Sequence, residues 1–588
     1  MNDKLRNILH TAWNEPRHFL VWLAMLSLCG FIVAVSGAVL IRPTLFLSFV
    51  ALLSLLCLLA SFPAFVLAWI PPVRRLFSWL LGRRFLALGC LVTLVALFYA
   101  VEDWRGRSAW QDFKREREAK GERFDVAGFA PPPVPADQNF FETPLFNDMH
   151  FVRTNRTTIW SDTNWGNHVI FTIYCPNDRN APNAGGWPKA QRVDLPAWQA
   201  YYRSTNNLFA APAGPPTNYF PIAKEPQTPA ADVLLALSKF DENRRLLIAA
   251  AARPEARFWI NYEDGFGMLF PHLARVKSFA QYLSFHASAA LQAGDHQTAL
   301  QDVNLIFRLL ESIRREPTII CHLVRVATLA IALQPIWEGL ADRQWTDADL
   351  TALETALGKL DILADYQIAM RSERACNVWA VDYFRKGGVF AVVEVEDSIR
   401  TPQPLDLPDF LGRAAFQFLP SGWFDQNKLS LCRLHEQYLL PLVDVPQRRI
   451  ASPAAIQQFS SALNHQHLRP YDTLSRMLLP GLVGVSGKCG RGQACADLAR
   501  VACALERYRL ANSQFPDTLD ALAPKFIENV PHDVMNAQPL KYRRTDDGQF
   551  LFYSIGANGI DDGGKVGLTK SGNWEPRQGD WVWRYPAK

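Results

Sequence analysis

Three apolar stretches without a charged residue open the chain, and this pattern predicts three membrane-spanning helices. They cover residues 19–41, 44–70 and 85–101. A helix needs about 20 apolar residues to cross the roughly 30 Å hydrocarbon layer of a bilayer, so the third stretch is the shortest candidate. A cleaved signal peptide would be one short apolar run, so we expect all three stretches to be retained.

Basic residues near these stretches predict their orientation, because Lys and Arg concentrate in cytoplasmic loops. The flanking basic residues are Lys4, Arg6 and Arg17 before the first stretch, and Arg74, Arg75, Arg83 and Arg84 before the third. The connection between the first two stretches contains only Arg42. We therefore expect a multi-pass protein of a bacterial inner (cytoplasmic) membrane, held in the lipid bilayer, with a cytoplasmic N-terminus and a large periplasmic C-terminal region. If the third stretch does not cross, that region is cytoplasmic instead.

The next segment combines a charged helix with a loop-rich region. Acidic and basic residues interleave between positions 102 and 120, which is typical of a solvated helix leaving a membrane. Prolines then interrupt the chain at 131–135, and residues 137–229 are rich in Asn, Pro, Gly and Trp. Within this part, only residues 168–174, with β-branched and aromatic side chains, predict a strand.

Apolar residues recur every three or four positions through residues 231–386 and predict a helical domain. Gly294 can end one helix and Asp295 can cap the next. This gives an αα-hairpin that resembles one tetratricopeptide joint, without the period of a repeat protein. Thr346 and Asp349 have the spacing of a capping box, so another helix is expected to begin there.

Residues 319–340 are apolar enough to suggest a fourth span. They contain His322, Arg325 and Gln334, which are costly in lipid, and Pro335, which disturbs a helix. We therefore predict a buried core helix of the soluble part.

A mixed helical and irregular region, 387–492, separates the helical domain from a C-terminal module at 493–588. The sequence G-L-V-G-V-S-G-K-C-G-R-G at the boundary lacks the pattern of a phosphate-binding loop, because Cys489 follows Lys488 where Ser or Thr is needed. We predict a flexible linker there. In the module, a helix at 494–511 precedes a hairpin with a turn at Asp547-Gly548.

Together these patterns predict an α+β protein. It has three N-terminal transmembrane helices, a loop-rich region, a helical middle domain built on an αα-hairpin, and a small C-terminal α+β module. The expected domains are residues 1–104, 105–230, 231–386, 387–492 and 493–588.

The C-terminal module carries the only family resemblance with specific motifs. The stretch A-L-E-R-Y-R-L-A-N-S-Q-F-P-D-T-L-D-A-L, with F-Y-S-I-G-A-N-G-I-D-D-G-G and G-D-W-V-W, resembles the globular part of the major pseudopilin of type II secretion. The resemblance implies a helix, a small antiparallel sheet and a calcium-binding loop. A pseudopilin begins with one long apolar helix, so filament assembly is not implied here. The remainder resembles large bacterial membrane-anchored proteins without an assigned activity.

Residue by residue, the resemblance implies Asp561 or Asp562 as one Ca²⁺ ligand and Asp580 as another. Backbone carbonyls near Ser554 and Asn558 would complete the shell. Such a Ca²⁺ would be structural, and its six to eight oxygen ligands suit a flexible glycine-rich loop. In the alternative, Asp561 and Asp562 serve only the glycine turn and no metal binds.

Composition argues against nucleic acid as a partner and does not decide whether the cysteines form a disulfide. The 588 residues contain 61 Lys and Arg against 56 Asp and Glu, a net charge of +5, which gives no basic surface for nucleic acid. The cysteines outside the apolar stretches are expected either as buried free thiols or with one Cys489–Cys495 disulfide.

Polar residues in the predicted helical core are the candidates for catalysis. His322 and Arg325 lie one turn apart in one helix, and Arg371, Glu373 and Arg374 cluster in another. Buried charges need partners, so one interpretation is an ion-pair network between helices. The other is acid–base catalysis by Glu373 and His322, although no nucleophile lies at a recognisable spacing.

These features favour a membrane-anchored, non-enzymatic envelope protein with a large extracytoplasmic binding or structural region and with envelope proteins as partners. One alternative is an envelope hydrolase that uses His322 and Glu373. Another is a component associated with a secretion machine, which rests on the pseudopilin resemblance alone.

Overall fold

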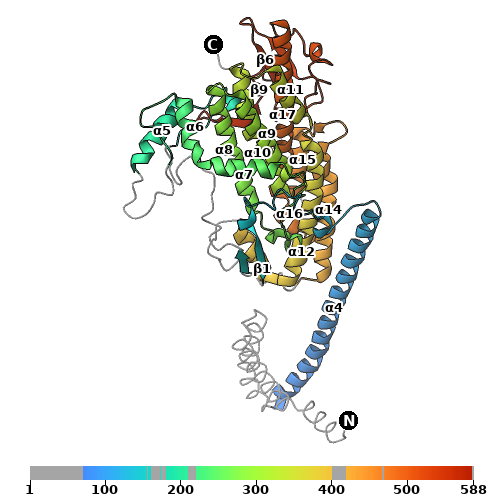
Figure 1. Cartoon of the computed structure of the whole chain (residues 1–588). Helices are drawn as coiled ribbons and strands as arrows, with labels where there is room; N and C mark the ends of the chain where they lie inside the picture. Colours follow the sequence, from blue (N-terminus) through green and yellow to red (C-terminus); the bar gives the residue numbers. More distant parts are fainter. Residues whose placement is uncertain are drawn as a thin grey trace. The chain divides into compact units, whose positions relative to one another are not determined.

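Helices dominate the structure. The computed structural model describes residues 71–154, 157–160, 173, 181–208, 220–399, 419–465 and 469–585 (Figure 1). The helices of this part are α4 (Pro71–Glu118), α5 (Leu195–Leu208), α6 (Pro229–Leu237), α7 (Asp241–Ala251), α8 (Pro271–Gln292), α9 (His296–Ser312), α10 (Ile319–Ala341), α11 (Asp347–Gly358), α12 (Ile362–Ile399), α14 (Ser421–Leu434), α15 (Pro453–His465), α16 (Thr473–Leu478) and α17 (Val485–Asn512).

The strands are short and scattered. They are β1 (Phe151–Thr154), β2 (Thr157–Trp160), β3 (Val443–Asp444), β4 (Arg449–Ile450), β5 (Lys541–Arg544), β6 (Phe550–Ser554), β7 (Val566–Leu568), β8 (Trp574–Gly579) and β9 (Trp581–Trp583). About 60% of the described residues are helical and 8% are in strands. The predicted α+β class is therefore wrong, because strands of this length form no layer and the core packs helix on helix.

The prediction of three N-terminal membrane helices is not supported either. The first two predicted spans, 19–41 and 44–70, lie outside the described residues. The third lies inside α4, which contains the single N-terminal candidate span among the described residues, Ala87–Glu118. The apolar stretch is thus one part of a 48-residue helix and not a short element of its own.

The helical hairpin predicted around Gly294 is confirmed. Gly294 has a φ of +85°, which suits a residue without a side chain just after α8. The Asp295 side chain accepts a hydrogen bond from Thr298 N at 3.0 Å and so caps α9. The two helices pack together and against α10, as Figure 1 shows.

The prediction of a core helix at 319–340 is also confirmed by α10. Of its most apolar window, 67% is buried by the rest of the protein. His322 and Arg325 are buried as well, because α8, α9 and α17 pack around the helix. Length and composition would allow α10 to cross a membrane, but its polar side chains already have protein partners.

The predicted flexible linker before the C-terminal module is wrong. The glycine-rich sequence forms the start of α17, which begins at Val485. A β-carbon on Gly490 would lie 2.6 Å from the Ile450 side chain, and one on Gly492 would lie 3.0 Å from Val326. The glycines therefore permit close packing of a helix rather than movement of a loop.

Cys489 and Cys495 lie in the same helix and are both buried free thiols. The predicted alternative of a disulfide between them is wrong, and that of buried free thiols is confirmed for this pair. In the part of the chain that the structure describes, the cysteines are unpaired and all except Cys90 are buried.

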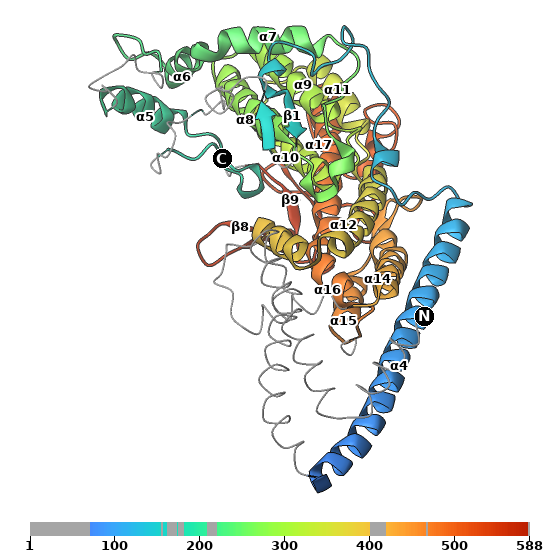
Figure 2. The same cartoon turned by 90° about the horizontal axis from the view of Figure 1, so that it is seen from below.

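The predicted C-terminal hairpin is present. β5 and β6 are antiparallel with Tyr542 opposite Phe552, and β9 pairs with the other edge of β6. β7 and β8 form a separate pair. β9 packs on α17 (Figure 2), and β6 also contacts α17, so these strands share the helical core. The strand predicted at 168–174 lies outside the described residues except for Ile173.

The chain divides into two compact units. One comprises Met1–Trp110 and Tyr383–Gln426, and the other comprises Gln111–Asp382 and Asn427–Lys588. The second, here called the helical unit, contains most of the elements named above.

In the first unit, α4 contacts the first turn of α14 backbone to backbone. A β-carbon on Gly106 would lie 2.0 Å from Gly422 O, which leaves no room for a side chain. Gly422 N donates a hydrogen bond to Asp103 Oδ1 at 2.8 Å, and Trp423 Nε1 donates to Glu102 Oε2 at 2.8 Å.

The packing of α17 predicts opposite effects for two glycine substitutions. Gly487 has open space around it, so Gly487→Ala should raise the melting temperature, since alanine favours a helix over glycine by about 0.5–1 kcal/mol. Gly490→Ala should lower it, because crowding a packed core costs about 1–3 kcal/mol. Thermal unfolding of the full chain in detergent measures both. An equal rise in both variants would contradict the close packing.

Candidate functional site

The two predicted catalytic residues lie on different helices, and no hydrogen bond among the described residues joins them. His322, on α10, contacts Cys489 of α17, with His322 Nε2 at 3.1 Å from Cys489 Sγ. Burial and the charge of Arg325 lower the pKa of His322 to about 4, and burial raises the pKa of Cys489 to about 12. At neutral pH the pair is therefore a neutral imidazole and a thiol, which is a buried hydrogen bond and not an activated nucleophile.

Glu373 lies on α12 and is half-buried. Burial raises the pKa of Glu373 to about 7. No side chain in the described part of the chain forms a hydrogen bond or ion pair with it. The other predicted interpretation, an ion-pair network, fits its neighbours better. Arg325 Nη1 lies 2.6 Å from Asp365 Oδ2 and joins α10 to α12.

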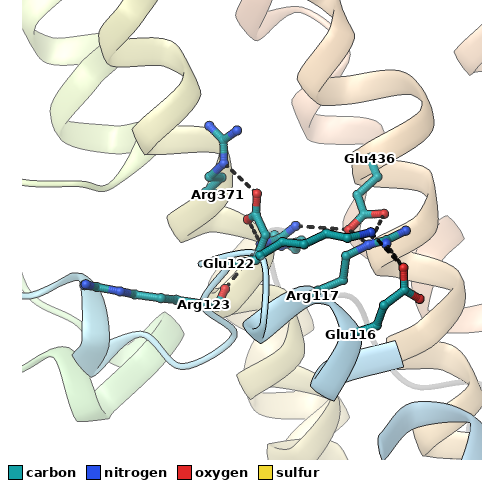
Figure 3. Close-up of polar contacts among 8 residues, drawn as sticks. Glu116, Arg117, Glu122, Arg123, Arg371 and Glu436 are labelled. Atoms are coloured by element: carbon teal, nitrogen blue, oxygen red, sulfur yellow. Dashed lines mark hydrogen bonds and ion pairs between the residues drawn. The ribbon is translucent and has the colours of Figure 1, made fainter. Parts of the chain in front are cut away.

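Ion pairs fix the end of α4 within the helical unit (Figure 3). Arg117 Nε lies 3.0 Å from both carboxylate oxygens of Glu436, which belongs to the π-helical turn His435–Leu439. Arg117 Nη1 also donates to Glu116 at 2.7 Å. Glu436 in turn lies 3.6 Å from Arg374 Nη1 of α12.

Glu122, just after α4, forms ion pairs with two arginines of α12 (Figure 3). Arg371 Nε lies 3.2 Å from Glu122 Oε1, and Arg374 Nη2 donates to Glu122 Oε2. Arg374 is fully buried, with its guanidinium 4.6 Å from the centre of the Phe124 ring. Burial raises the pKa of Glu122, but the hydrogen bonds and charges of both arginines outweigh it, so this pKa lies below its ordinary value.

The predicted calcium ligands lie together in the C-terminal loop, but hydrogen-bond donors occupy them. Asp580 is buried and accepts from Asp562 N at 3.3 Å and from Gly564 N at 2.7 Å. Asp561 Oδ1 accepts from the Tyr553 hydroxyl at 2.9 Å.

Asn558 Nδ2 donates to Asp562 Oδ2 at 2.8 Å, so this pair also faces inward on the loop. Among the described residues, no group of three metal-ligating side chains converges on a point. The arrangement does not fit a Ca²⁺ shell without reorientation of Asp561 and Asp562, and the calcium hypothesis stays a prediction.

A cavity of about 580 Å³ in the helical unit is the candidate binding site. Four aromatic side chains from separate elements line it: Trp187, Trp198 of α5, Phe285 of α8 and Trp574 of β8. Ser278, Gln281 and Ser284 of α8 and Gln334 of α10 supply its polar side chains.

Side chains of α10 at four-residue spacing hold the loop that carries Trp187. Gln334 Oε1 accepts a hydrogen bond from Trp187 N at 2.7 Å, and Glu338 Oε1 accepts one from Val193 N at 2.8 Å. Gln334 Nε2 also donates to Glu338 Oε1 at 2.7 Å, so the two side chains fix each other. Burial raises the pKa of Glu338.

Three further contacts define the path of this loop. Gly185 has a φ of +88°, and a β-carbon there would lie 2.5 Å from Gln334 Nε2, so glycine is required. One turn beyond Glu338, Asp342 Oδ1 pairs with Arg192 Nε at 3.1 Å. Trp198 Nε1 donates to Asn183 O at 3.2 Å and secures the start of the loop.

The sequence did not predict this cavity. It indicated only that residues 137–229 are rich in tryptophan and glycine. Gln334 drew attention as a residue unsuited to lipid, yet its bond to Trp187 spans 147 residues. An uncharged polar residue in an apolar core helix was the one signal of a buried partner.

Comparisons of the chain with protein-family models, curated proteins and solved structures found no match. The pseudopilin resemblance therefore stays a prediction. Its expected element order, a helix followed by a small antiparallel sheet, corresponds here to α17 and the strands β5, β6 and β9.

Removal of the charge on Glu122 should destabilise the helical unit. In Glu122→Gln, the buried Arg374 loses its closest counter-charge, which should cost about 3 kcal/mol, the low end for a buried pair because Glu122 is 22% exposed. Glu242→Gln, which breaks the exposed pair with Arg245, should change stability little. Chemical unfolding of the full chain measures both.

The same comparison has a defined pH dependence. A lowered folded-state pKa stabilises the protein above the unfolded value of 4.5, and this stability is lost as the pH falls through the folded pKa. The difference in unfolding free energy between wild type and Glu122→Gln should therefore have its full value at neutral pH and become smaller below about pH 4.5. A difference that is independent of pH would contradict the ion pair.

The calcium hypothesis is tested by thermal unfolding of the full chain. If Ca²⁺ binds the folded loop, it should raise the melting temperature in wild type and not in Asp561→Asn. Asp546→Asn, outside the loop, serves as the control. The absence of any shift on addition of Ca²⁺ or chelator would remove the hypothesis.

Proposed function

We propose that the chain is a membrane-anchored envelope protein whose helical unit binds a small ligand in the aromatic cavity. The observation that carries the anchor is the exposure of apolar side chains all around α4. Those between 47% and 64% exposed are Leu88, Leu91, Val92, Leu94, Val95, Leu97, Phe98 and Val101. Only 6% of the most apolar part of this helix is buried by the rest of the protein.

Exposure of such a surface to water is unfavourable, because it costs roughly 25 cal/mol of free energy for each Å² of apolar area. A helix that is apolar all around is typical of a lipid-embedded segment, because its backbone is already hydrogen-bonded. The contrast with α10 supports this assignment, since protein covers most of α10.

The flanking sequence supports an orientation. Arg74, Arg75, Arg83 and Arg84 precede the apolar stretch, whereas charges of both signs follow it between positions 102 and 120. By the positive-inside rule, the N-terminal end of the stretch then faces the cytoplasm and the helical unit lies outside it, in the periplasm. Ligand binding would occur on that side.

No described contact favours catalysis by His322 and Glu373, so an enzymatic function is not proposed. Association with a secretion machine rests on the C-terminal resemblance alone, and copurification with secretion subunits would be its test.

Cys90, in the exposed apolar part of α4, reports on the anchor. In intact membranes, a water-soluble maleimide should leave Cys90 unmodified, because the reagent does not reach a thiol that is embedded in lipid. A cysteine introduced as Lys224→Cys, on the exposed surface of the helical unit, should react. Peptide mass spectrometry measures both, and detergent should make Cys90 reactive.

Fusions at the C-terminus test the side of the membrane. Alkaline phosphatase, which folds only after export, should be active there, and a cytoplasmic fluorescent reporter should be dark. The opposite result would place the helical unit in the cytoplasm.

Rapid modification of Cys90 in intact membranes would contradict the anchor itself.

A further inference from the structure

The walls of the aromatic cavity restrict the chemistry of its ligand. None of the described residues that line it carries a charged side chain. A charged ligand would lose hydration without gaining a counter-charge, at a cost of several kcal/mol. The cavity therefore favours a neutral ligand.

The indole and phenyl rings favour a ligand with a flat apolar face. Trp198 and Phe285 lie with ring centres 4.8 Å apart, and Trp187 and Trp574 lie 6.4 Å apart. Trp187 also packs on Trp583 at 5.2 Å, which fixes its ring from behind. Rings held in this way bury apolar surface with little loss of conformational freedom.

The polar side chains have unused hydrogen-bonding capacity, most of it as acceptors. The Ser278 and Ser284 hydroxyls donate to Arg275 O and Ile331 O, each at 3.0 Å, so only their lone pairs remain. The Gln334 amide nitrogen already donates to two acceptors. A ligand must therefore offer hydrogen-bond donors to these groups.

Two groups remain as donors. Trp574 Nε1 is buried and has no hydrogen-bond partner among the described residues. Gln281 is exposed on α8 at the cavity, and its amide can both donate and accept. A hydrocarbon ligand would offer this buried indole N–H no acceptor, which is unfavourable.

We infer that the cavity binds a neutral saccharide, an inference that rests on the proposed binding function. A sugar ring has an apolar C–H face for the indoles and hydroxyl groups that donate and accept at several positions. The cavity volume of about 580 Å³ lies within the range of small-molecule sites.

A neighbouring cavity of about 240 Å³ provides an internal contrast. It shares Trp187 and Trp574 but is also lined by Lys488 and Arg491. The Arg491 guanidinium lies 5.3 Å from the centre of the Trp574 ring. A ligand with a carboxylate would favour this side, so acidic sugars distinguish the two cavities.

Binding is measured on the full chain in lipid nanodiscs by tryptophan fluorescence and by melting temperature. The probes are glucose, galactose, N-acetylglucosamine and their disaccharides, with glucuronate and glucosamine as charged analogues and indole as a neutral apolar one. At least one neutral saccharide should change the emission saturably and raise the melting temperature. The charged analogue of that sugar should bind at least tenfold more weakly.

Variants connect the signal to the cavity. Gln281→Ala should weaken saccharide binding about tenfold, whereas Gln292→Ala, an exposed glutamine of α8 outside the cavity, should not. Trp574→Phe keeps a ring but removes the buried donor and should also weaken binding. The melting temperature of each variant without ligand shows whether it is folded.

The outcomes separate the ligand class from the proposed function. If indole binds in the cavity and saccharides do not, the saccharide inference is overturned while a binding function stands. Tighter binding of glucuronate than of neutral sugars would overturn the inference of a neutral ligand. If no probe binds, the saccharide inference fails, and Cys90 labelling decides the membrane anchor independently.

Discussion

The need of buried backbone groups for hydrogen-bond partners governs the part of the structure that forms the cavity. Within the loop before α5, Gly186 and Gln191 exchange backbone hydrogen bonds, and α10 supplies acceptors for two further amides of the loop. Gln334 and Glu338 accept hydrogen bonds from the backbone N–H groups of Trp187 and Val193. These contacts bring an indole to the cavity wall. A loop without these partners would leave buried amides unsatisfied, at a cost of about 1–3 kcal/mol each. The site thus depends on polar residues inside an apolar helix.

Buried polar pairs have a similar role elsewhere in the helical unit. Arg325 with Asp365 joins α10 to α12, and Arg374 with Glu122 joins α12 to the segment after α4. Such pairs contribute little net stability, because both charges lose hydration, but a wrong arrangement of the helices would leave one charge alone. They therefore select one packing among several that bury the same apolar area. Reactivity is not their evident role, as the neutral His322 and Cys489 pair illustrates.

Local patterns predicted local structure well. The hairpin around Gly294, the core helix with His322, and the turn at Asp547-Gly548 each follow from periodicity, capping or turn chemistry within a few residues. The linker prediction failed at Gly490, because glycine in sequence does not distinguish a loop from a closely packed helix. The cavity could not be predicted, since its rings come from positions as distant as Trp187 and Trp574. The suggested pairing of His322 with Glu373 stays a prediction, because sequence spacing gives no distance between helices.

The contact between α4 and α14 has a consequence for biosynthesis. Asp103 and its partner Gly422 are separated by 319 residues, so the apolar helix leaves the ribosome long before its partner exists. The first unit can therefore close only after nearly three quarters of the polypeptide has been made. Closure of this unit is therefore a late event in biosynthesis, because its two segments are made far apart in time.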